Sequence, residues 1–354
     1  MKNHILKSFF SSGLQAIAVQ VLGVLFIAVV AKVLPKEEFG IMQWANVTAM
    51  FITTLLSFGM EQVVVRRIAA SAASDWAAAA FLIHNLVGSV LAFGITLLAA
   101  FLLPDPNGAS QYLPLFFAAQ GVIFLVTPLK QFLNAKHIFT PYGIVAVISN
   151  TLKLVLAYVL IKNGSFNIVG TGIILFTCAS IELVAIFIYV RVKTSFKLRF
   201  RFIAYKKLLK ESMPQYLAVV FDSSLSRLDM LLLGIIGGSY VAMGEYGFAY
   251  RAFEMARLPI VIIAPIILNI FSKMFISGKK LTKDKQHIIK QLYSLEMFFA
   301  VLIPLALNII WSPVMDDFFD YKYGTANATE FMLLSICIPL HFFINLLWTI
   351  SFAN

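Results

Sequence analysis

Charged residues are scarce in this chain. Asp, Glu, Lys and Arg together make up 13% of its 354 residues, whereas hydrophobic residues make up 60%. An ordinary soluble domain is about one-quarter charged. This scarcity excludes a soluble domain of any size and leaves long hydrophobic runs as the dominant feature of the sequence.

Cysteine is also scarce. Cys178 and Cys337 are the only two, and each lies in an apolar stretch far from the other. This excludes a disulfide framework and a cysteine-rich metal site, so we expect both to be small core residues. The sequence has no nucleotide-binding loop, and we expect neither a cofactor nor a bound metal.

Apolar segments fill most of the chain, and each can cross about 30 Å of hydrocarbon as a helix that rises about 1.5 Å per residue. The ten segments are 13–34, 42–64, 79–103, 112–133, 142–161, 167–190, 213–237, 248–271, 291–312 and 328–353. The sequence therefore predicts an all-α fold, a polytopic helical membrane protein with about ten transmembrane helices.

Basic residues alternate between the loops. The N-terminus and every second loop carry twenty Lys and Arg, and the other loops carry four. The positive-inside rule then places the N-terminus in the cytoplasm. The net charge of +11 is explained by orientation and by contact with anionic membrane lipids, so we expect no nucleic-acid partner.

A short internal repeat indicates two lobes. Residues 38–45 and 245–252 match at Glu38/Glu245, Gly40/Gly247 and Ala45/Ala252. The offset between these positions is 207 residues, and it superimposes the first two predicted helices on the seventh and eighth. An even number of helices separates the two copies. Both copies therefore have the same orientation, the parallel-repeat arrangement in which transporters bind substrate between lobes.

We therefore predict a six-helix N-terminal lobe over residues 1–192, a basic cytoplasmic linker over 193–212, and a C-terminal lobe over 213–354 with four helices. The linker alternates basic and apolar residues from Phe196 to Phe202. This pattern fits an amphipathic stretch on the inner leaflet, and it fits a solvated connector equally well.

The start of the chain resembles a known family. Leu34-Pro35-Lys36-Glu37-Glu38-Phe39-Gly40, then Phe58-Gly59 and Arg66-Arg67, resemble the opening of bacterial polysaccharide exporters. These oligosaccharide flippases share a superfamily with the lipid II flippases and the multidrug and toxin extrusion antiporters. Such flippases have about twelve to fourteen helices, so we expect the natural chain to continue beyond residue 354.

The resemblance implies a flippase of the inner (cytoplasmic) membrane. Such a protein moves a polyprenyl-pyrophosphate-linked oligosaccharide outward by alternating access, for synthesis of cell-surface polysaccharide such as lipopolysaccharide. It also implies contacts with other polysaccharide-assembly proteins. A drug or cation antiporter is the alternative, and a membrane enzyme of polysaccharide assembly is a third reading. We expect no enzyme, because the predicted outer loops are too short for a catalytic site.

Charged residues inside the predicted spans are the candidate site. Each costs about 2.5–3.5 kcal/mol at a helix centre, so such residues face a cavity or one another. Guanidinium groups bind phosphate in bidentate fashion, so three arginines would attract an anionic head group. The alternative is a structural ion-pair cluster. The candidate residues are Asp222, Arg227, Asp229, Arg251, Glu254 and Arg257, with Lys153 adding charge from the first lobe or extending toward the inner surface.

One weaker motif lies in an outer loop. Asp316, Asp317 and Asp320 have the spacing of an aspartate-rich magnesium and pyrophosphate motif. An ordinary acidic loop explains them better, so we assign no metal to it.

Overall fold

The computed structural model describes residues 2–71, 75–102, 108–194, 196–236, 239–260 and 283–353, and its longer elements there are all α-helices. Seven of the described helical stretches are long and apolar enough to cross a membrane, and a shorter apolar one covers Ile17–Val33. The chain is therefore an all-α, multi-pass membrane protein, as predicted. Its contacts divide it into two compact units, Met1–Met243 and Gly244–Asn354.

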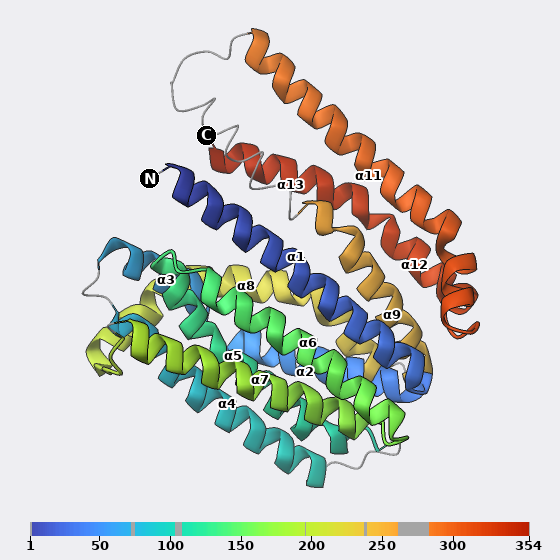
Figure 1. Ribbon diagram of the computed structural model, residues 1–354, viewed down its shortest axis with the longest axis horizontal. Helices are drawn as coiled ribbons and strands as arrows, with labels where there is room; N and C mark the ends of the chain where they lie inside the picture. The colour runs from blue at the N-terminus through green and yellow to red at the C-terminus, as the bar shows by residue number, and fades with distance from the viewer. Residues whose placement is uncertain are drawn as a thin grey trace. The chain divides into compact units, whose positions relative to one another are not determined.

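The helices of the first unit follow one another with short connections (Figure 1). They are α1 (Lys2–Val33), α2 (Lys36–Leu56), α3 (Met60–Ala70), α4 (Trp76–Leu102), α5 (Leu113–Ala135), α6 (Thr140–Lys162), α7 (Ile168–Lys193) and α8 (Phe202–Ile236). Helix α5 packs against α4 and α7, and α1 packs against α6. Helix α9 (Tyr240–Ala256) crosses the boundary between the units.

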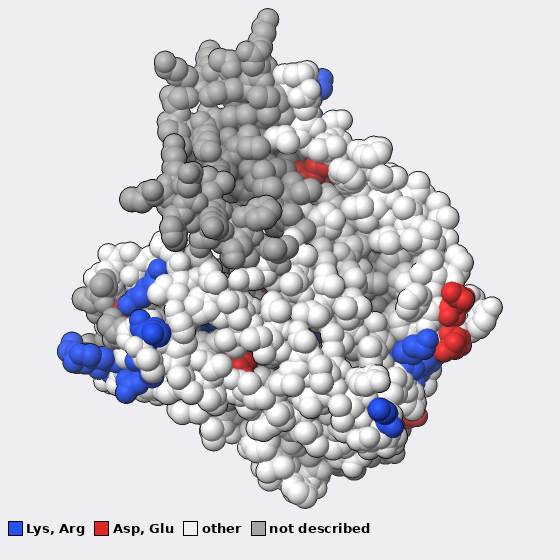
Figure 2. All heavy atoms as spheres, in the orientation of Figure 1, with Lys and Arg blue, Asp and Glu red and all other residues white. Residues whose placement is uncertain are grey.

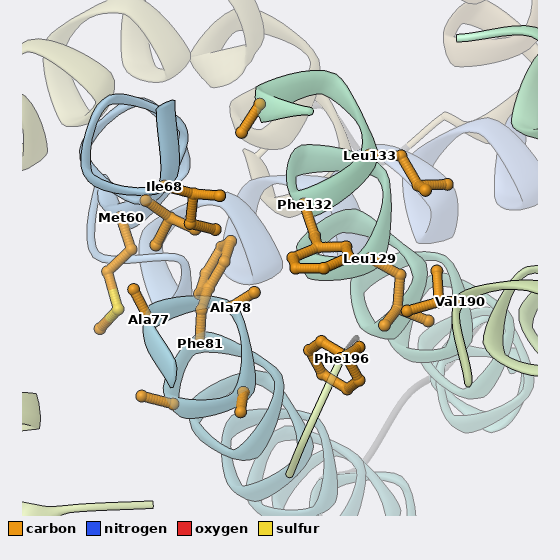
Figure 3. Packing of buried hydrophobic residues seen from close by; sticks show 14 of the residues in the cluster. Met60, Ile68, Ala77, Ala78, Phe81, Leu129, Phe132, Leu133, Val190 and Phe196 are labelled. Atoms are coloured by element: carbon orange, nitrogen blue, oxygen red, sulfur yellow. The ribbon is translucent and has the colours of Figure 1, made fainter. Parts of the chain in front are cut away.

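A buried cluster holds the ends of α3, α4, α5 and α7 together (Figure 3). Four successive alanines, Ala77 to Ala80, are fully buried at the start of α4, and their small side chains let the helix backbones approach closely. Phe81, Phe132 and Phe196 fill the space between these helices. Farther along α4 the apolar side chains are exposed, as expected of a surface that faces lipid.

The segment predicted at 42–64 is not one helix. Helix α2 ends at Leu56 and α3 begins at Met60, because Phe58 and Gly59 have positive φ angles of 52° and 63°. The Phe58 ring stacks on Tyr216 of α8, with the ring centroids 4.4 Å apart. The break therefore brings the polar residues that flank it against α8.

Helix α8 begins at Phe202, inside the predicted linker, and packs against α2 and α3. The described residues between α7 and α8, Thr194 and 196–201, are non-helical. Arg67 of α3 holds α8, since its Nε donates to Glu211 Oε2 over 2.8 Å. The predicted assignment of lobes and linker stays a prediction.

The second unit contains most of α9, together with α11 (Lys283–Phe318), α12 (Ala328–Ser335) and α13 (Cys337–Ala353). The segment predicted at 328–353 is interrupted at Ile336. The Trp311 ring stacks on Phe331 with 3.9 Å between centroids, and its Nε1 donates to Asn327 over 3.0 Å. The end of the predicted span 248–271 lies outside the described residues.

The two cysteines lie in different surroundings. Cys178 is buried, as predicted, but Cys337 is exposed. The core prediction for Cys337 is wrong because it opens α13 on an outward-facing side of that helix. In a membrane protein, side chains that face lipid are as apolar as side chains in the core, so the hydropathy pattern does not distinguish the two.

Candidate functional site

A cavity of about 260 Å³ lies between the α2–α3 break and α8. The lining residues of α8 form a single stripe along that helix. They follow Gln215 at spacings of four, seven, eight, eleven and twelve residues, and such spacings place side chains on one helix face. The lining residues are Thr54, Ser57, Gly59, Glu61, Gln62, Gln215, Val219, Asp222, Ser223, Ser226 and Arg227. Most of them carry hydroxyl, amide or charged groups.

The cavity combines charges of both signs. Arg227 is half-buried and forms no ion pair or hydrogen bond with any residue that the structure describes. Glu61 accepts a hydrogen bond from Gln131 Nε2 over 3.2 Å, and Asp222 is exposed. Two carboxylates and one guanidinium make the lining formally net negative by one charge. Such a lining can take both the anionic and the hydroxyl groups of a polar ligand.

Ser223 is the buried polar group of this cavity. Its side chain is 5% exposed, and its hydroxyl oxygen has no hydrogen-bond partner among the described residues. A buried hydroxyl without a partner costs roughly 1–3 kcal/mol. A bound polar ligand or water in the cavity would remove that cost.

The predicted charges of α9 lie at the helix end. Arg251 Nη1 donates to Glu254 Oε2 over 2.8 Å, so the predicted i, i+3 pairing forms within this helix. Arg257 follows the last residue of α9, and its guanidinium carbon lies 5.5 Å from the centroid of the Phe253 ring. All three charged side chains are only partly buried. One guanidinium is therefore neutralised by a carboxylate, and the other contacts an aromatic face.

The other two candidates have local contacts. Lys153 of α6 donates to Asn150 Oδ1 over 3.2 Å, and it lies within electrostatic range of Glu182, which pairs with Lys130 over 2.7 Å. Asp229 is exposed and accepts from the backbone N–H of Met230 over 2.7 Å. Of the predicted set, the structure brings Asp222 together with Arg227 and Arg251 together with Glu254.

Several cavity residues were not predicted as site residues. Glu61 of α3 is one of them. The missing members are Thr54, Ser57, Gln62, Gln215, Ser223 and Ser226. The helical spacing of the polar residues in α8 was the available signal, because a polar stripe in an apolar helix faces a polar space.

The aspartate-rich motif has a structural role, and Asp316 and Asp317 lie in the last turn of α11 rather than in the predicted loop. Both Asp316 carboxylate oxygens accept a hydrogen bond from the backbone N–H of Thr325, over 3.0 and 3.2 Å. The Thr325 hydroxyl also donates a hydrogen bond to Asp316 Oδ2. Gly324, with φ of +65°, lies directly against this carboxylate. In the part of the chain that the structure describes, no group of three His, Cys, Asp or Glu is arranged to hold a metal ion.

Comparisons with known proteins give a family and a fold. A family model described as "Polysaccharide biosynthesis protein" matches residues 5–275. A search of curated proteins finds no significant match. Solved structures of MATE transporters are similar in fold, at identities too low to say more than that.

Three of these structures illustrate the similarity. An inward-facing multidrug resistance MATE family transporter of the MOP superfamily has a TM-score of 0.74 at 16% identity, with 94% of this chain and 81% of that chain covered. A MATE transporter in the straight conformation scores 0.65 at 16% identity, with 99% and 82% covered. The Vibrio cholerae MATE transporter VcmN scores 0.64 at 15% identity, with 99% and 83% covered.

Proposed function

The chain belongs to the polysaccharide biosynthesis protein family, and we propose that it is a flippase for a lipid-linked oligosaccharide. Its cargo is a polyprenyl pyrophosphate that carries sugars, moved outward across the inner membrane, with the N-terminus in the cytoplasm. Transport proceeds by alternating access, in which two lobes expose one site to each side in turn. Surface polysaccharide synthesis is the process that it serves.

The surroundings of Arg227 support this proposal most directly. Its half-buried guanidinium lies on α8, within the span predicted at 213–237, and has no partner among the described residues. An intramembrane charge costs about 2.5–3.5 kcal/mol on insertion scales, so it is retained for function by default. The planar guanidinium matches the oxygen geometry of a phosphate.

The rest of the lining suits the sugar part of such a cargo. The amides of Gln62 and Gln215 donate and accept hydrogen bonds, and the carboxylates of Glu61 and Asp222 accept them from sugar hydroxyls. Ser223 gains the partner that it lacks.

A drug or cation antiporter is the second candidate. The formal excess of one negative charge in the cavity would attract a cation by the same electrostatics that lets Arg227 attract an anion. The two candidates predict opposite results for the charged residues. Removing the arginine should abolish flipping, whereas removing the carboxylates should abolish cation export.

The test uses a bacterial strain that lacks its own oligosaccharide flippase and expresses this chain or a variant. Surface glycan is measured and normalised to membrane-inserted protein. Arg227→Ala should lower surface glycan at least tenfold, and Arg227→Lys should restore it partly, because the ammonium keeps the charge without the planar fork. The matched control is Leu225→Ala, at an exposed apolar position two residues away on α8.

A parallel arm measures accumulation of a cationic dye in the same cells. Full glycan export by Arg227→Ala together with loss of dye export in Glu61→Gln/Asp222→Asn would overturn the flippase and establish the antiporter. Loss of glycan export with unchanged dye accumulation supports the flippase.

A further inference from the structure

The connection between α7 and α8 is rich in positive charge. Residues 196–210, named here the basic connection, contain six Lys or Arg and neither Asp nor Glu. All six basic residues are exposed: Lys197, Arg199, Arg201, Lys206, Lys207 and Lys210. None of their side chains forms a hydrogen bond or ion pair with another residue in the described ranges. Figure 2 shows Lys and Arg gathered at the end of the bundle where this connection lies in Figure 1.

The same connection also exposes large apolar side chains. Residues 196–201 form neither a helix nor a strand, and basic and apolar residues alternate along them in the sequence. The odd positions, Lys197 to Arg201, are basic, and the even positions are apolar. Beyond the buried Phe196, the apolar side chains are 43% to 86% exposed, at Leu198, Phe200, Phe202 and Ile203.

Both ends of this stretch are fixed to the protein. Phe196 lies in the buried cluster with its ring edge toward Phe132, 5.1 Å between centroids (Figure 3). Arg191 donates to the Phe196 carbonyl over 3.4 Å, and the Tyr205 hydroxyl is 2.8 Å from Nδ1 of His84. The exposed apolar residues between these anchors are therefore presented outward by the fold.

We propose that the basic connection is a binding surface for anionic phospholipids of the leaflet at that end of the bundle. Leu198, Phe200, Phe202 and Ile203 enter the boundary between head groups and acyl chains. The basic side chains contact the lipid phosphates. Exposed basic and apolar side chains together hold interfacial segments on an anionic membrane.

Two observations favour a bilayer over a soluble acidic partner. The apolar face of the connection continues directly from Phe196, which is buried beside Val190 at the end of a membrane-crossing helix. A soluble polyanion would neutralise the charges but leave the alternate apolar side chains in water. The proposal rests on the membrane location of the chain and does not depend on the cargo.

Site-directed spin labelling of the whole chain in lipid nanodiscs tests the proposal. Single cysteines replace Leu198, Arg199, Phe200 or Arg201 in a Cys178→Ala/Cys337→Ser background. Accessibility to oxygen, which concentrates in the acyl region, is compared with accessibility to a water-soluble nickel chelate. With phosphatidylglycerol present, labels at 198 and 200 should favour oxygen, and labels at 199 and 201 should favour nickel.

Recognition of the lipid charge is tested in the same way. Replacing phosphatidylglycerol by phosphatidylcholine, or introducing Lys206→Gln/Lys207→Gln/Lys210→Gln, should raise nickel accessibility at 198 and 200 at least threefold. The matched control, Lys36→Gln/Lys162→Gln/Lys322→Gln, removes three charges from the predicted outer loops. It should leave the nickel accessibility at 198 and 200 unchanged. Equal nickel accessibility at all four sites would overturn the proposal, as would an alternation that is insensitive to lipid charge. No glycan is present, so this result is independent of the flippase test.

Discussion

Gly59 lies directly against the backbone of Tyr216. A Cβ atom added at Gly59 would be 2.6 Å from the Tyr216 backbone nitrogen, and the residue has a φ of +63°. Real Cβ atoms do not approach backbone atoms that closely, and the left-handed conformation disfavours a side chain independently. This one glycine therefore allows the α2–α3 break to form against α8, and the break shapes the cavity.

Gly59→Ala should destabilise the chain. The clash is with backbone, so α8 must move, and the strain of a non-glycine residue at positive φ adds about 1–2 kcal/mol. We expect a lower thermal unfolding midpoint in detergent and lower abundance in the membrane. Gly23→Ala is the matched control, because a Cβ there meets nothing within 4 Å. Equal midpoints for the two variants would contradict the close packing of α8 on the break.

The Arg67–Glu211 pair should make stability depend on acid pH. The hydrogen bond from Arg67 lowers the pKa of Glu211 below its ordinary value. A carboxyl whose pKa is lower in the folded than in the unfolded chain stabilises the folded protein. This contribution is fully present at pH values above the unfolded-state pKa of about 4.3, and it is lost as the pH falls through the folded-state pKa. The pair is partly exposed, so its contribution is at most about 1 kcal/mol.

Comparison of the natural chain with Glu211→Gln measures this contribution. The difference in unfolding midpoint should be present at neutral pH and should vanish as the pH falls below about 4. Glu37→Gln, at an exposed acidic residue of α2, is the control for a general charge effect. A difference that is constant across the whole pH range would show that Glu211 acts by packing.

The hydropathy pattern predicts the helices well because the lipid environment requires long apolar segments with internal backbone hydrogen bonds. It cannot predict the break at Phe58-Gly59, since the positive φ angles depend on α8, which is distant in sequence. The Arg251–Glu254 pair follows from helical spacing. The cavity does not, because Glu61 and Arg227 share it only through the packing of α3 on α8.

Asp316→Ala should destabilise the second unit, and magnesium should have no part in this. The carboxylate accepts hydrogen bonds from the Thr325 backbone and side chain, so its removal leaves a partly buried N–H without a partner, at a cost of roughly 1–3 kcal/mol. The unfolding midpoint should fall for Asp316→Ala, and Asp317→Ala, at the exposed neighbour, should match the natural chain. A chelator should leave all three midpoints unchanged. A fall in the natural chain on chelation would restore the magnesium interpretation.

Arg251 of α9 and Arg257, directly after that helix, should behave differently when replaced. Arg251 neutralises Glu254, so Arg251→Ala leaves a partly buried carboxylate without that partner, and protein abundance should fall. Arg251→Ala/Glu254→Ala removes both charges and should restore abundance, a coupling that a double-mutant cycle measures.

Arg257 contacts an aromatic ring, so Arg257→Ala should insert normally but lower surface glycan several-fold, and Arg257→Lys should recover only part of it. Both measurements use the flippase-deficient strain, with abundance from membrane immunoblots. Normal export by Arg257→Ala at normal abundance would show that Arg257 has no part in transport.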